Sequence, residues 1–326
     1  MTQKLNWGLL STAKINHALI NPLTASPRTR LLAVASRSQS SADEYARKWK
    51  IPRAHGSYES LLADPEIDVI YNSLPNHLHT EWTIKALKAG KHVLCEKPLA
   101  LTLSEMDAMI TASKETGKIL MEAFMYRHHP QTLKVKEIVE SGKLGKLQFI
   151  RGSFTFTISR EGDIRLKKEM GGGSIWDVGC YPINYARYVV GAEPLEVFGW
   201  QVTGLGGIDD SFVGQLRFKD GIHMQFDSGL KSPSRSYIEI VGTQGTLSIP
   251  NPFKPNLGDK IELQRGDEIE VIKIKGQELY LGEVDDMCDA ILLGKTPRVS
   301  LADSSANTSA ILALLESARL GKPVAV

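Results

Sequence analysis

Three side chains in this sequence, Lys97, Asp177 and Tyr181, together have the chemistry to move a proton on and off a hydroxyl group. Lys97 lies in Glu96-Lys97-Pro98, directly after the apolar run 92–95, which predicts a buried strand. A lysine at the carboxyl end of a parallel strand stands where open α/β sheets bind their ligands. Asp177 and Tyr181 are four residues apart, so on a helix they project from one face. These groups predict the proton-transfer half of a hydride-transfer reaction.

Tyr181 is the expected base and acid of this reaction. A free phenol has a pKa of about 10, which is too high for a good base near neutrality. A nearby ammonium group, here Lys97, favours tyrosinate and can also hydrogen-bond the substrate oxygen as charge develops. Asp177 can accept from a substrate hydroxyl or hold Lys97 in place. The alternatives are a solvated turn lysine, a half-buried core tyrosine and a first-turn aspartate that answers the helix dipole.

Composition restricts the classes of protein to which the chain can belong. At 326 residues it exceeds the size at which one hydrophobic core keeps growing, so we expect two domains. The net charge is +2 without a long block of either sign, so we expect no nucleic-acid partner. No apolar run approaches the roughly 18 residues of a spanning helix, so we expect no membrane partner. Cys95, Cys180 and Cys288 lack metal-ligand spacing, which predicts free thiols in the cytoplasm and no metal site.

The first 123 residues alternate between strand-like and helix-like segments. Near-continuous runs of Val, Ile and Leu suit the strands of a parallel sheet buried on both faces. We predict strands at Leu5–Leu10, Leu31–Ser36, Val69–Ser73, His92–Cys95 and Ile119–Met121. We predict helices at Asn16–Ala25, Ser40–Trp49, His79–Ala89 and Ser104–Thr116, the last capped by Ser104. This alternation predicts an α/β Rossmann domain over residues 1–123.

The pattern changes after Met125, where a predicted helix at Gln131–Ser141 leads into a series of strand-like segments. We predict strands at Leu147–Thr157, Leu195–Leu205, Phe212–Phe218, His223–Ser228, Tyr237–Val241, Thr246–Ile249 and Lys260–Lys275. Their alternation of apolar and polar residues is typical of an antiparallel sheet with one covered face. Further helices are predicted at Ile175–Val190, Glu283–Leu293 and Leu301–Leu320. Residues 124–326 are therefore predicted to form an α+β domain with a large, mostly antiparallel open sheet.

The turn after the first strand is where a dinucleotide-binding fold places G-x-G-x-x-G, whose glycines let the backbone approach a pyrophosphate. Here the three glycine positions hold Ser11, Ala13 and Asn16. By itself this pattern fits any tight turn between a strand and a helix equally well. Small side chains at positions 11 and 13 still permit close approach, and amides at the start of the next helix can bind an anion.

The end of the second predicted strand indicates which dinucleotide is used. An acidic residue there would bond the adenosine ribose hydroxyls of NAD, but this sequence has Ser36-Arg37-Ser38. Arg37 offers a bidentate fork for a 2′-phosphate, and the two serines offer hydroxyl donors. We therefore predict NADP(H) as the cofactor. An exposed loop arginine without a ligand is the alternative.

Three motifs together resemble those of the Gfo/Idh/MocA oxidoreductases, which are NAD(P)-dependent enzymes of sugars and cyclitols. They are Glu96-Lys97-Pro98, the segment 74–79 (Leu-Pro-Asn-His-Leu-His), and Gly171-Gly172-Gly173 followed by Asp177 and Tyr181. The resemblance covers the whole chain and implies a Rossmann domain followed by an open-sheet domain. Tyrosine at position 181 is similar to the branch that holds glucose–fructose oxidoreductase, dihydrodiol dehydrogenase and NADP-dependent xylose dehydrogenase.

The resemblance also implies residues for each part of the site. The implied cofactor contacts are Ser11, Thr12, Ala13, Ile15, Ser36, Arg37, Ser38, Leu74, Asn76, His79, Glu96 and Lys97. The implied contacts to a sugar or polyol substrate are Met125, Arg127, Asp163, Arg165 and Trp176. Asp163 and Arg165 fit a solvated loop nearly as well, and His79 also fits the start of a helix. The resemblance further implies a cis bond before Pro98, although only about 5–6% of X-Pro bonds in folded proteins are cis.

Two further functions stay open from the sequence. A ketoreductase acting on a nucleotide-linked keto-sugar would need basic groups for a diphosphate, and Arg127, Arg160 and Arg165 are candidates. A catalytically silent NADP-binding sensor is the other alternative, but such a protein has no need of all three proton-transfer side chains.

Apolar residues of the second domain predict self-association. Val197, Phe198, Trp200, Val213 and Phe226 supply more bulky apolar side chains than one covered sheet face needs. A contiguous exposed apolar patch usually marks association, and a two-fold dimer is the commonest arrangement. We therefore predict a homodimer or a higher homo-oligomer.

Overall fold

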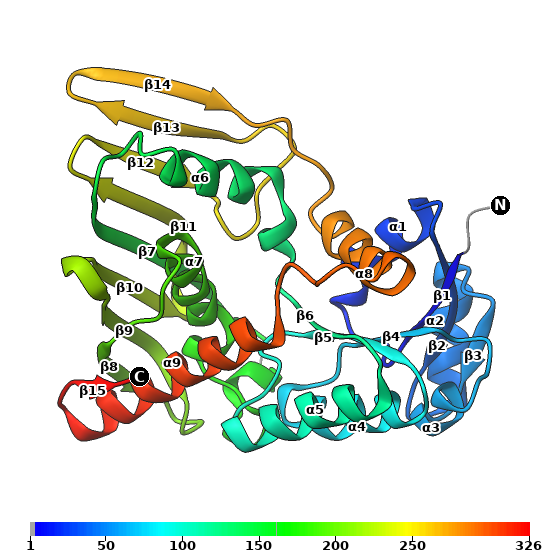
Figure 1. Cartoon of the computed structure of the whole chain (residues 1–326). Helices are drawn as coiled ribbons and strands as arrows, with labels where there is room; N and C mark the ends of the chain where they lie inside the picture. The colour runs from blue at the N-terminus through cyan, green and yellow to red at the C-terminus, as the bar shows by residue number, and fades with distance from the viewer. Residues whose placement is uncertain (1–3, 161) are drawn as a thin grey trace. The chain divides into compact units, whose positions relative to one another are not determined.

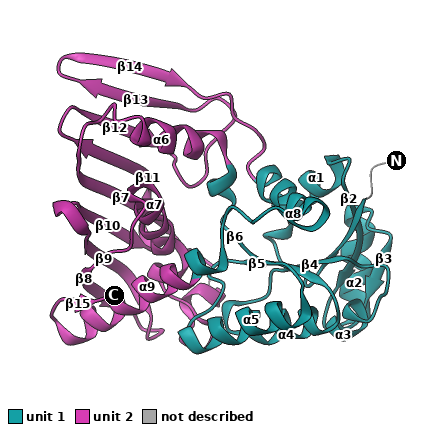
Figure 2. Cartoon of the chain, in the orientation of Figure 1, with its two compact units in different colours: residues 1–128, 280–304 teal, residues 129–279, 305–326 magenta. Residues whose placement is uncertain are grey.

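The computed structural model of the chain describes residues 4–160 and 162–326. The chain divides into two compact units (Figure 2). The first unit contains residues up to 128 together with 280–304, and the second contains residues 129–279 and 305–326. Among the described residues, no helix combines the length and the apolar character needed to cross a membrane.

The first unit is built on a six-stranded parallel sheet (Figure 1). Its strands are β1 Leu5–Leu9, β2 Thr29–Ala35, β3 Arg53–His55, β4 Val69–Asn72, β5 His92–Glu96 and β6 Leu120–Ala123. Its first five helices are α1 Asn16–Ala25, α2 Gln39–Trp49, α3 Tyr58–Leu62, α4 His79–Lys88 and α5 Leu103–Thr116. The strand order β3-β2-β1-β4-β5-β6 reverses direction between β1 and β4, as in a doubly wound dinucleotide-binding fold. The predicted Rossmann architecture is confirmed.

The apolar runs of the first unit form strands because both faces of the sheet are covered. Val69 and Leu94 pack with Leu19 of α1 on one face. Ile70 and Val93 pack with residues of α4 and α5 in a separate cluster on the other face. Successive residues of one strand therefore lie in two different cores, and this explains why each strand reads as an unbroken apolar run.

Helix α8, Leu281–Leu293, belongs to the first unit although it follows the second sheet in sequence (Figure 2). Its side chains Val284, Met287 and Cys288 are fully buried in the same apolar cluster as Leu19 of α1. The chain therefore returns to the first unit, which differs from the single boundary expected at residue 123. A helical pattern indicates that one face is covered, but not which sheet covers it.

The second unit contains a nine-stranded sheet in the order β14-β13-β12-β11-β7-β10-β9-β8-β15. Its strands are β7 Leu147–Thr157, β8 Glu196–Thr203, β9 Asp209–Arg217, β10 His223–Gly229, β11 Lys231–Gly242, β12 Gly245–Pro250, β13 Lys260–Arg265, β14 Glu268–Lys273 and β15 Val324–Ala325. The strands pair in antiparallel fashion except β7 with β10, which are parallel. The predicted large, mostly antiparallel sheet is confirmed.

Helices cover one face of this sheet. They are α6 Pro130–Glu140, α7 Cys180–Val190 and the part of α9, Leu301–Leu320, that belongs to the second unit. Val197, Leu216 and Met224 on adjacent strands are each 1% exposed and point to the covered face. Ser317 Oγ of α9 accepts a hydrogen bond from the backbone N–H of Gly199 in β8 over 3.1 Å, so this helix lies directly against the sheet.

The five apolar residues predicted for the exposed face of the sheet divide between its two faces. Val197 and Phe226 are each 1% exposed, so their assignment to the exposed face is corrected. Trp200 and Val213 are 55% and 38% exposed, and Phe198 is half-buried. Successive side chains of a strand point to opposite faces of the sheet, so the five residues cannot all lie on one face. The exposed apolar surface is therefore smaller than the sequence suggests.

Several local elements differ from their predictions. Strand β3 and helix α3 have three and five residues, too few for a periodic pattern, and they were not predicted. The segment predicted as one strand from Lys260 to Lys275 is the hairpin β13–β14, turned at Gly266, whose φ is +58°. The cap of α5 is Thr102, which accepts from Glu105 N over 3.2 Å, and not Ser104.

Candidate active site

The turn after β1 is closed by side chains where a dinucleotide fold uses glycines. Ser11 Oγ accepts a hydrogen bond from Ala13 N over 3.0 Å and lies 2.7 Å from Ser73 Oγ. Asn16 is completely buried, and its Nδ2 donates to Ser11 O over 2.7 Å. Three of the predicted cofactor contacts are exposed or partly exposed in this turn, namely Thr12, Ala13 and Ile15. The turn is therefore tight without glycine, and its tip stays accessible.

The three residues after β2 have different environments. Ser36 is buried, and its N–H donates to His55 O over 3.0 Å. Ser38 caps α2, because its Oγ accepts from Ser41 N over 3.4 Å. Arg37 is exposed and forms no ion pair within the described part of the chain. The guanidinium donors of Arg37 are therefore available to an anion, which fits the predicted 2′-phosphate contact.

His79 connects the turns that follow β4 and β5. Its Nδ1 lies 2.8 Å from Pro98 O, and its Nε2 lies 2.8 Å from Leu74 O. His79 is fully buried, and burial lowers its pKa, which favours the neutral ring. These contacts make His79 a support for the two turns. Of the other two predicted contacts in the first turn, Leu74 is buried and Asn76 is partly exposed.

Glu96 and Lys97 lie at the carboxyl end of β5. The Tyr71 hydroxyl donates to the Glu96 carboxylate, and burial raises the pKa of Tyr71 well above its ordinary value, so the phenol keeps its proton. Lys97 N donates to Glu96 Oε2 over 3.3 Å. The Lys97-Pro98 bond is cis, as predicted. Glu96 therefore orients the turn that presents Lys97, with help from Tyr71, which the sequence did not single out.

Arg127 does not have the free charge that the sequence suggested. Its Nη1 lies 2.7 Å from Asp303 Oδ2, and 5% of its side chain is exposed. Met125 is 2% exposed in the same segment. The neighbouring His128 lies 3.1 Å from Asp286 and is similarly buried. Arg127 is therefore compensated by a carboxylate 176 residues away, which leaves less of its charge for a diphosphate.

Asp177 and Tyr181 lie on consecutive parts of one helical segment in the second unit. Asp177 is in a π-helical turn, Ile175–Gly179, and Tyr181 is in the first turn of α7. Cys180 N donates to Ile175 O, an i→i+5 bond that widens the turn between the two side chains. Single π turns inside α-helices recur at functional sites. The helix predicted from Ile175 is present, but its first turn is not α-helical.

Arg165 links Asp177 to Asp163. Its Nη1 lies 3.6 Å from Asp177 Oδ2, and its Nε and Nη2 donate to the two oxygens of Asp163, each over 2.9 Å. The hydrogen bond from Arg165 is the main cause that lowers the pKa of Asp163. The guanidinium also lies over the ring of Phe156, 5.2 Å from its centroid. The loop that carries Asp163 and Arg165 is therefore attached to Asp177, and is not simply solvated.

Tyr181 is held in an aromatic cluster. Its ring centroid lies 5.4 Å from that of Phe154 in β7 and 5.6 Å from that of Phe253. Tyr181 is 4% exposed, and the predicted substrate contact Trp176 is 8% exposed. The packing of the ring does not depend on the hydroxyl group, so the hydroxyl can be removed without removing these contacts.

The buried carboxylate of Asp209, at the start of β9, contacts the first residues of the same helical segment. The sequence analysis did not identify it as a site residue. Its Oδ2 accepts from Ser174 Oγ over 2.6 Å and from Ile175 N over 2.7 Å. Burial raises the pKa of Asp209 to about 6, so the carboxyl is still ionised at neutral pH. The predicted strand began at Phe212, so the alternation of Asp209 and Asp210 between the two faces of β9 could not be inferred from the sequence.

The described residues provide the groups for two kinds of chemistry. In the first unit, an accessible tight turn and the exposed Arg37 fit the phosphates of a dinucleotide, while Lys97 stands at the end of β5. In the second unit, the phenol of Tyr181 and the carboxylate of Asp177 fit proton exchange with a hydroxyl group. No cluster of three or more His, Cys, Asp and Glu side chains that could hold a metal ion occurs in the described ranges.

Two family models match the sequence. Residues 5–124 match the oxidoreductase family with an NAD-binding Rossmann fold, and residues 132–248 match the GFO/IDH/MocA C-terminal domain. The chain is 34% identical over 321 residues to D-xylose 1-dehydrogenase (NADP(+)) 2 from Haloferax volcanii, with 98% of each protein covered.

Solved structures agree with these matches. An aldose–aldose oxidoreductase from Caulobacter crescentus, complexed with glycerol, is 29% identical with a TM-score of 0.93, over 99% of this chain and 100% of that one. A 3-ketoreductase from Actinomadura kijaniata, in complex with NADP and TDP-benzene, is 28% identical with a TM-score of 0.92, over 97% and 98% of the two chains. The matches cover both units, and the chain belongs to the Gfo/Idh/MocA family of NAD(P)-binding oxidoreductases.

Proposed function

We propose that this protein is an NADP-dependent oxidoreductase that transfers a hydride between the nicotinamide and a hydroxyl or carbonyl carbon of a sugar or related polyol. The observation that carries the proposal is the position of Lys97 at the carboxyl end of β5, in a sheet whose strand order reverses between β1 and β4. Ligands of open α/β sheets bind at this edge. The names of the xylose dehydrogenase and aldose–aldose oxidoreductase relatives support a sugar as the substrate.

NADP is favoured over NAD by the residues after β2. Arg37 is exposed without an ion pair in the described part of the chain, and no carboxylate occupies the adjacent positions Ser36 and Ser38. A guanidinium binds a 2′-phosphate through two charge-assisted hydrogen bonds. The NADP named for two relatives is consistent with this assignment. The bound nicotinamide would accept or donate the hydride.

Tyr181 would exchange the hydroxyl proton of the substrate. Lys97 would stabilise the ionised phenol and donate a hydrogen bond to the substrate oxygen. Asp177 would accept a hydrogen bond from a neighbouring hydroxyl of the sugar, with its orientation maintained by Arg165. Lys97 belongs to one unit and Tyr181 to the other, so their cooperation is the part of the proposal that a double mutant tests.

Further substrate contacts are proposed at the residues around Asp177. Asp163 and Arg165 are joined to each other, yet 38% of the Arg165 side chain is exposed and can still donate to a hydroxyl. Trp176 offers an apolar surface for the carbon face of a sugar ring, and Met125 is the remaining candidate from the first unit. Removal of a sugar contact should raise KM more than it lowers kcat.

A second candidate is a reductase of nucleotide-linked keto-sugars. The 3-ketoreductase relative with bound NADP and TDP-benzene favours it. Among the three arginines considered for a diphosphate, Arg127 is paired with Asp303 and Arg165 with Asp163, while Arg160 is exposed. The reduced set of basic groups makes a free sugar or polyol the better candidate.

A turnover assay separates these functions. The protein is mixed with NADP⁺ or NAD⁺ and a panel of aldoses and polyols, and with NADPH and a TDP-linked keto-sugar in parallel. Turnover of an aldose or polyol with NADP⁺ supports the proposal, and turnover of the TDP-linked substrate alone supports the second candidate. NADPH binding without any turnover would support a silent sensor.

The same assay on Lys97→Ala, Tyr181→Phe and the double mutant tests whether the two residues act as a unit. A unit predicts that the double mutant is little worse than the more severe single mutant. Effects that multiply would mean that the two side chains contribute independently.

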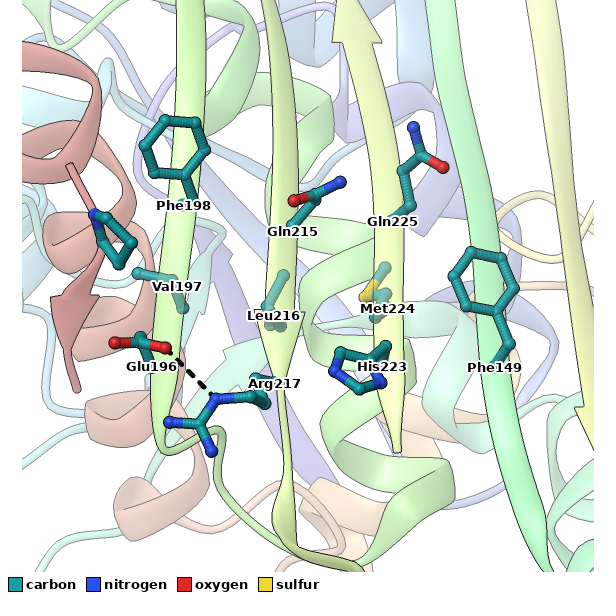
Figure 3. Close-up of a pocket in the computed structure, with 11 residues that line it drawn as sticks. Phe149, Glu196, Val197, Phe198, Gln215, Leu216, Arg217, His223, Met224 and Gln225 are labelled. Atoms are coloured by element: carbon teal, nitrogen blue, oxygen red, sulfur yellow. Dashed lines mark hydrogen bonds and ion pairs between the residues drawn. The ribbon is translucent and has the colours of Figure 1, made fainter. Parts of the chain in front are cut away.

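We also propose that the protein is a homodimer, joined through the exposed face of the nine-stranded sheet. Trp200 and Val213 are paired across β8 and β9, and Phe198 lies 4.1 Å from Trp200 between ring centroids. Figure 3 shows Phe198, Gln215 and Gln225 on three adjacent strands, where they line a pocket. A second copy related by a two-fold axis could cover the exposed rings.

The cytoplasm is the proposed location. Cys95, Cys180 and Cys288 are all free and buried. Unpaired thiols fit a reducing compartment. Fractionation of cells that express the tagged protein would test this location.

A further inference from the structure

Asp209 connects the sheet of the second unit to the helical segment that carries Asp177 and Tyr181. It lies at the first position of β9 and is 4% exposed. Its Oδ2 accepts from both the side chain of Ser174 and the backbone N–H of Ile175, over 2.6 and 2.7 Å. Ser174 Oγ also lies 2.9 Å from Ser228 Oγ in β10, so two strands of the sheet take part in the same contact.

The glycine triplet before this segment is shaped around these contacts. Gly173 has φ of +125°, and a Cβ at this position would lie 2.2 Å from Asp209 Oδ1. A Cβ on Gly172 would lie 2.4 Å from the backbone carbonyl of Arg165. The triplet therefore lets the Asp209 carboxylate and the Arg165 carbonyl approach the backbone, which no residue with a side chain would permit without movement.

A buried carboxylate is a costly way to attach a helix to a sheet. A charge loses its hydration when it is buried, and hydrogen bonds must offset that loss. The offset here comes from N–H and O–H groups at the amino end of the helical segment, where a negative charge is also favoured by the helix dipole. The rest of α7 is already held by apolar burial of Ile183, Tyr185 and Ala186, each 0% exposed.

Asp209 contacts the first residue of the π turn, Ile175–Gly179, which carries Asp177. Its i→i+5 bond between Cys180 N and Ile175 O lies directly after the anchored N–H of Ile175. π turns are rare because the α-helical alternative is more stable. A fixed first residue would oppose relaxation of this turn to an α-helix, and such relaxation would rotate Asp177 relative to Tyr181.

We propose that Asp209 is a positioning residue for the hydride-transfer reaction: its carboxylate fixes the start of the π turn and thereby the relative placement of Asp177 and Tyr181. This inference rests on the proposed function. Asp209 itself acts through Ser174 and Ile175 and does not touch the reacting atoms.

The test compares Asp209→Asn with the matched variant Asp210→Asn. Asn has the shape of Asp, but it lacks the charge and presents an amide N–H₂ to one side of the donors. Asp210 is the next residue of the same strand and accepts from Lys231 Nζ over 2.5 Å, away from the helical segment. Each variant loses the charge of one carboxylate of β9 that accepts hydrogen bonds, so a difference between them reports the contact of Asp209 with Ser174 and Ile175.

Four quantities are measured for both variants and the parent: kcat, KM, the Kd of NADPH, and hydrogen–deuterium exchange of the amides of residues 173–181. For Asp209→Asn we expect kcat to fall at least tenfold, with KM within threefold and the Kd of NADPH within twofold. Exchange in residues 173–181 should be at least tenfold faster than in the parent. Asp210→Asn should stay within twofold of the parent in all four.

The outcomes separate this inference from the proposed function. Unchanged exchange in residues 173–181 of Asp209→Asn overturns the positioning role, whether or not a substrate is found. A parent protein that turns over no sugar overturns the proposed function and leaves the exchange result valid. A folded Asp209→Asn protein with kcat within twofold of the parent overturns the effect on catalysis.

Ser174→Ala serves if Asp209→Asn does not fold. It removes one of the two hydrogen bonds to Asp209 Oδ2 and leaves the bond from Ile175 N. We expect a smaller loss of kcat, about threefold to tenfold, with faster exchange in the same segment. Parent values of both kcat and exchange in Ser174→Ala would overturn the inference.

Discussion

Arg165 is bound to Asp177 and to the glycine triplet before it: its Nη1 lies 3.6 Å from Asp177 Oδ2, and its backbone carbonyl accepts from Gly173 N over 3.0 Å. Asp177 is therefore held by a cation that is itself held by Asp163, through two hydrogen bonds of 2.9 Å. The orientation of this carboxylate depends on the fork geometry of one guanidinium.

Replacement of Arg165 by lysine should weaken turnover although the charge is kept. An ammonium group cannot hold both oxygens of Asp163 and reach Asp177 as a guanidinium does. The pair is partly exposed, and such pairs are worth about 0.5–1 kcal/mol, so kcat/KM should fall about two- to fivefold. Arg319→Lys is the matched control, because Arg319 forms a comparable two-bond contact with Glu316 on the exposed side of α9. Equal effects of the two substitutions would contradict a specific role for Arg165.

Tyr181→Phe should nearly abolish turnover and leave NADPH binding intact. Only the hydroxyl is removed, and the ring keeps its contacts with Phe154 and Phe253. General acid–base catalysis contributes about 10²–10⁴-fold, which sets the expected loss in kcat. Tyr185→Phe, one turn further along α7 and also buried, is the control and should retain kcat within threefold. If Tyr181→Phe also retains kcat within threefold, proton transfer belongs to another group, and Asp177 is the next candidate.

Arg37→Ala should erode the preference for NADP(H) by about tenfold or more, with little change in the Kd of NADH. The reason is that a hydrogen bond to a charged group is worth about 1.5–3 kcal/mol, and only NADP carries the 2′-phosphate that would use it. Arg47→Ala removes an exposed positive charge from α2 and controls for general electrostatic attraction. Fluorescence titration with both cofactors gives the ratio of Kd values. Equal affinity of the parent protein for NADPH and NADH would refute the assignment.

Stability should depend on the ionisation of Asp209 in a defined direction. Burial raises its pKa to about 6 in the folded protein, whereas an unfolded aspartate titrates near 3.9. Between pH 4 and pH 6 the folded state therefore binds more protons than the unfolded state, so this group destabilises the fold as pH rises through that window. The contribution is on the order of 3 kcal/mol, and it is constant above the folded pKa.

Urea unfolding of the parent and Asp209→Asn at pH 4, 5, 6 and 7 measures this contribution. The free energy of unfolding of the parent, relative to that of Asp209→Asn, should fall from pH 4 to pH 6. Above pH 6 the difference between the two proteins should level off. A difference that is independent of pH would mean that Asp209 has an ordinary pKa in the folded protein.

Trp200→Glu should convert the proposed dimer to a monomer. Trp200 is 55% exposed beside Phe198 and Val213, where a buried charge would prevent close contact of two copies. Leu257→Glu places the same charge on a 68% exposed leucine outside the strands and should leave the dimer intact. Sedimentation velocity at micromolar concentration distinguishes the two species. A parent protein that sediments only as a monomer would rule out the proposed interface.

Local sequence patterns were sufficient to predict the main elements. The bounds of α1, α9 and β7 agree with their predictions, and β5 differs by one residue. The reason is that these segments show a clear pattern of apolar residues, and the faces that this pattern marks as apolar are the faces covered in the structure. The apolar run 92–95 likewise placed Lys97 after β5, and the four-residue spacing placed Asp177 and Tyr181 on one helical segment. The cis Lys97-Pro98 bond, which the family resemblance implied, is confirmed.

Contacts between distant residues were decided by the tertiary structure alone. Arg127 reads as a free basic group, yet Asp303 neutralises it from 176 residues away. Helix α8 reads as part of the second domain, yet Val284 and Met287 are buried in the first. Asp209 lies outside the predicted strand Phe212–Phe218, yet it begins β9 and meets Ser174 across 35 residues. A local pattern specifies which side chains should be buried, but the partner that satisfies a buried charge is determined only when the elements pack.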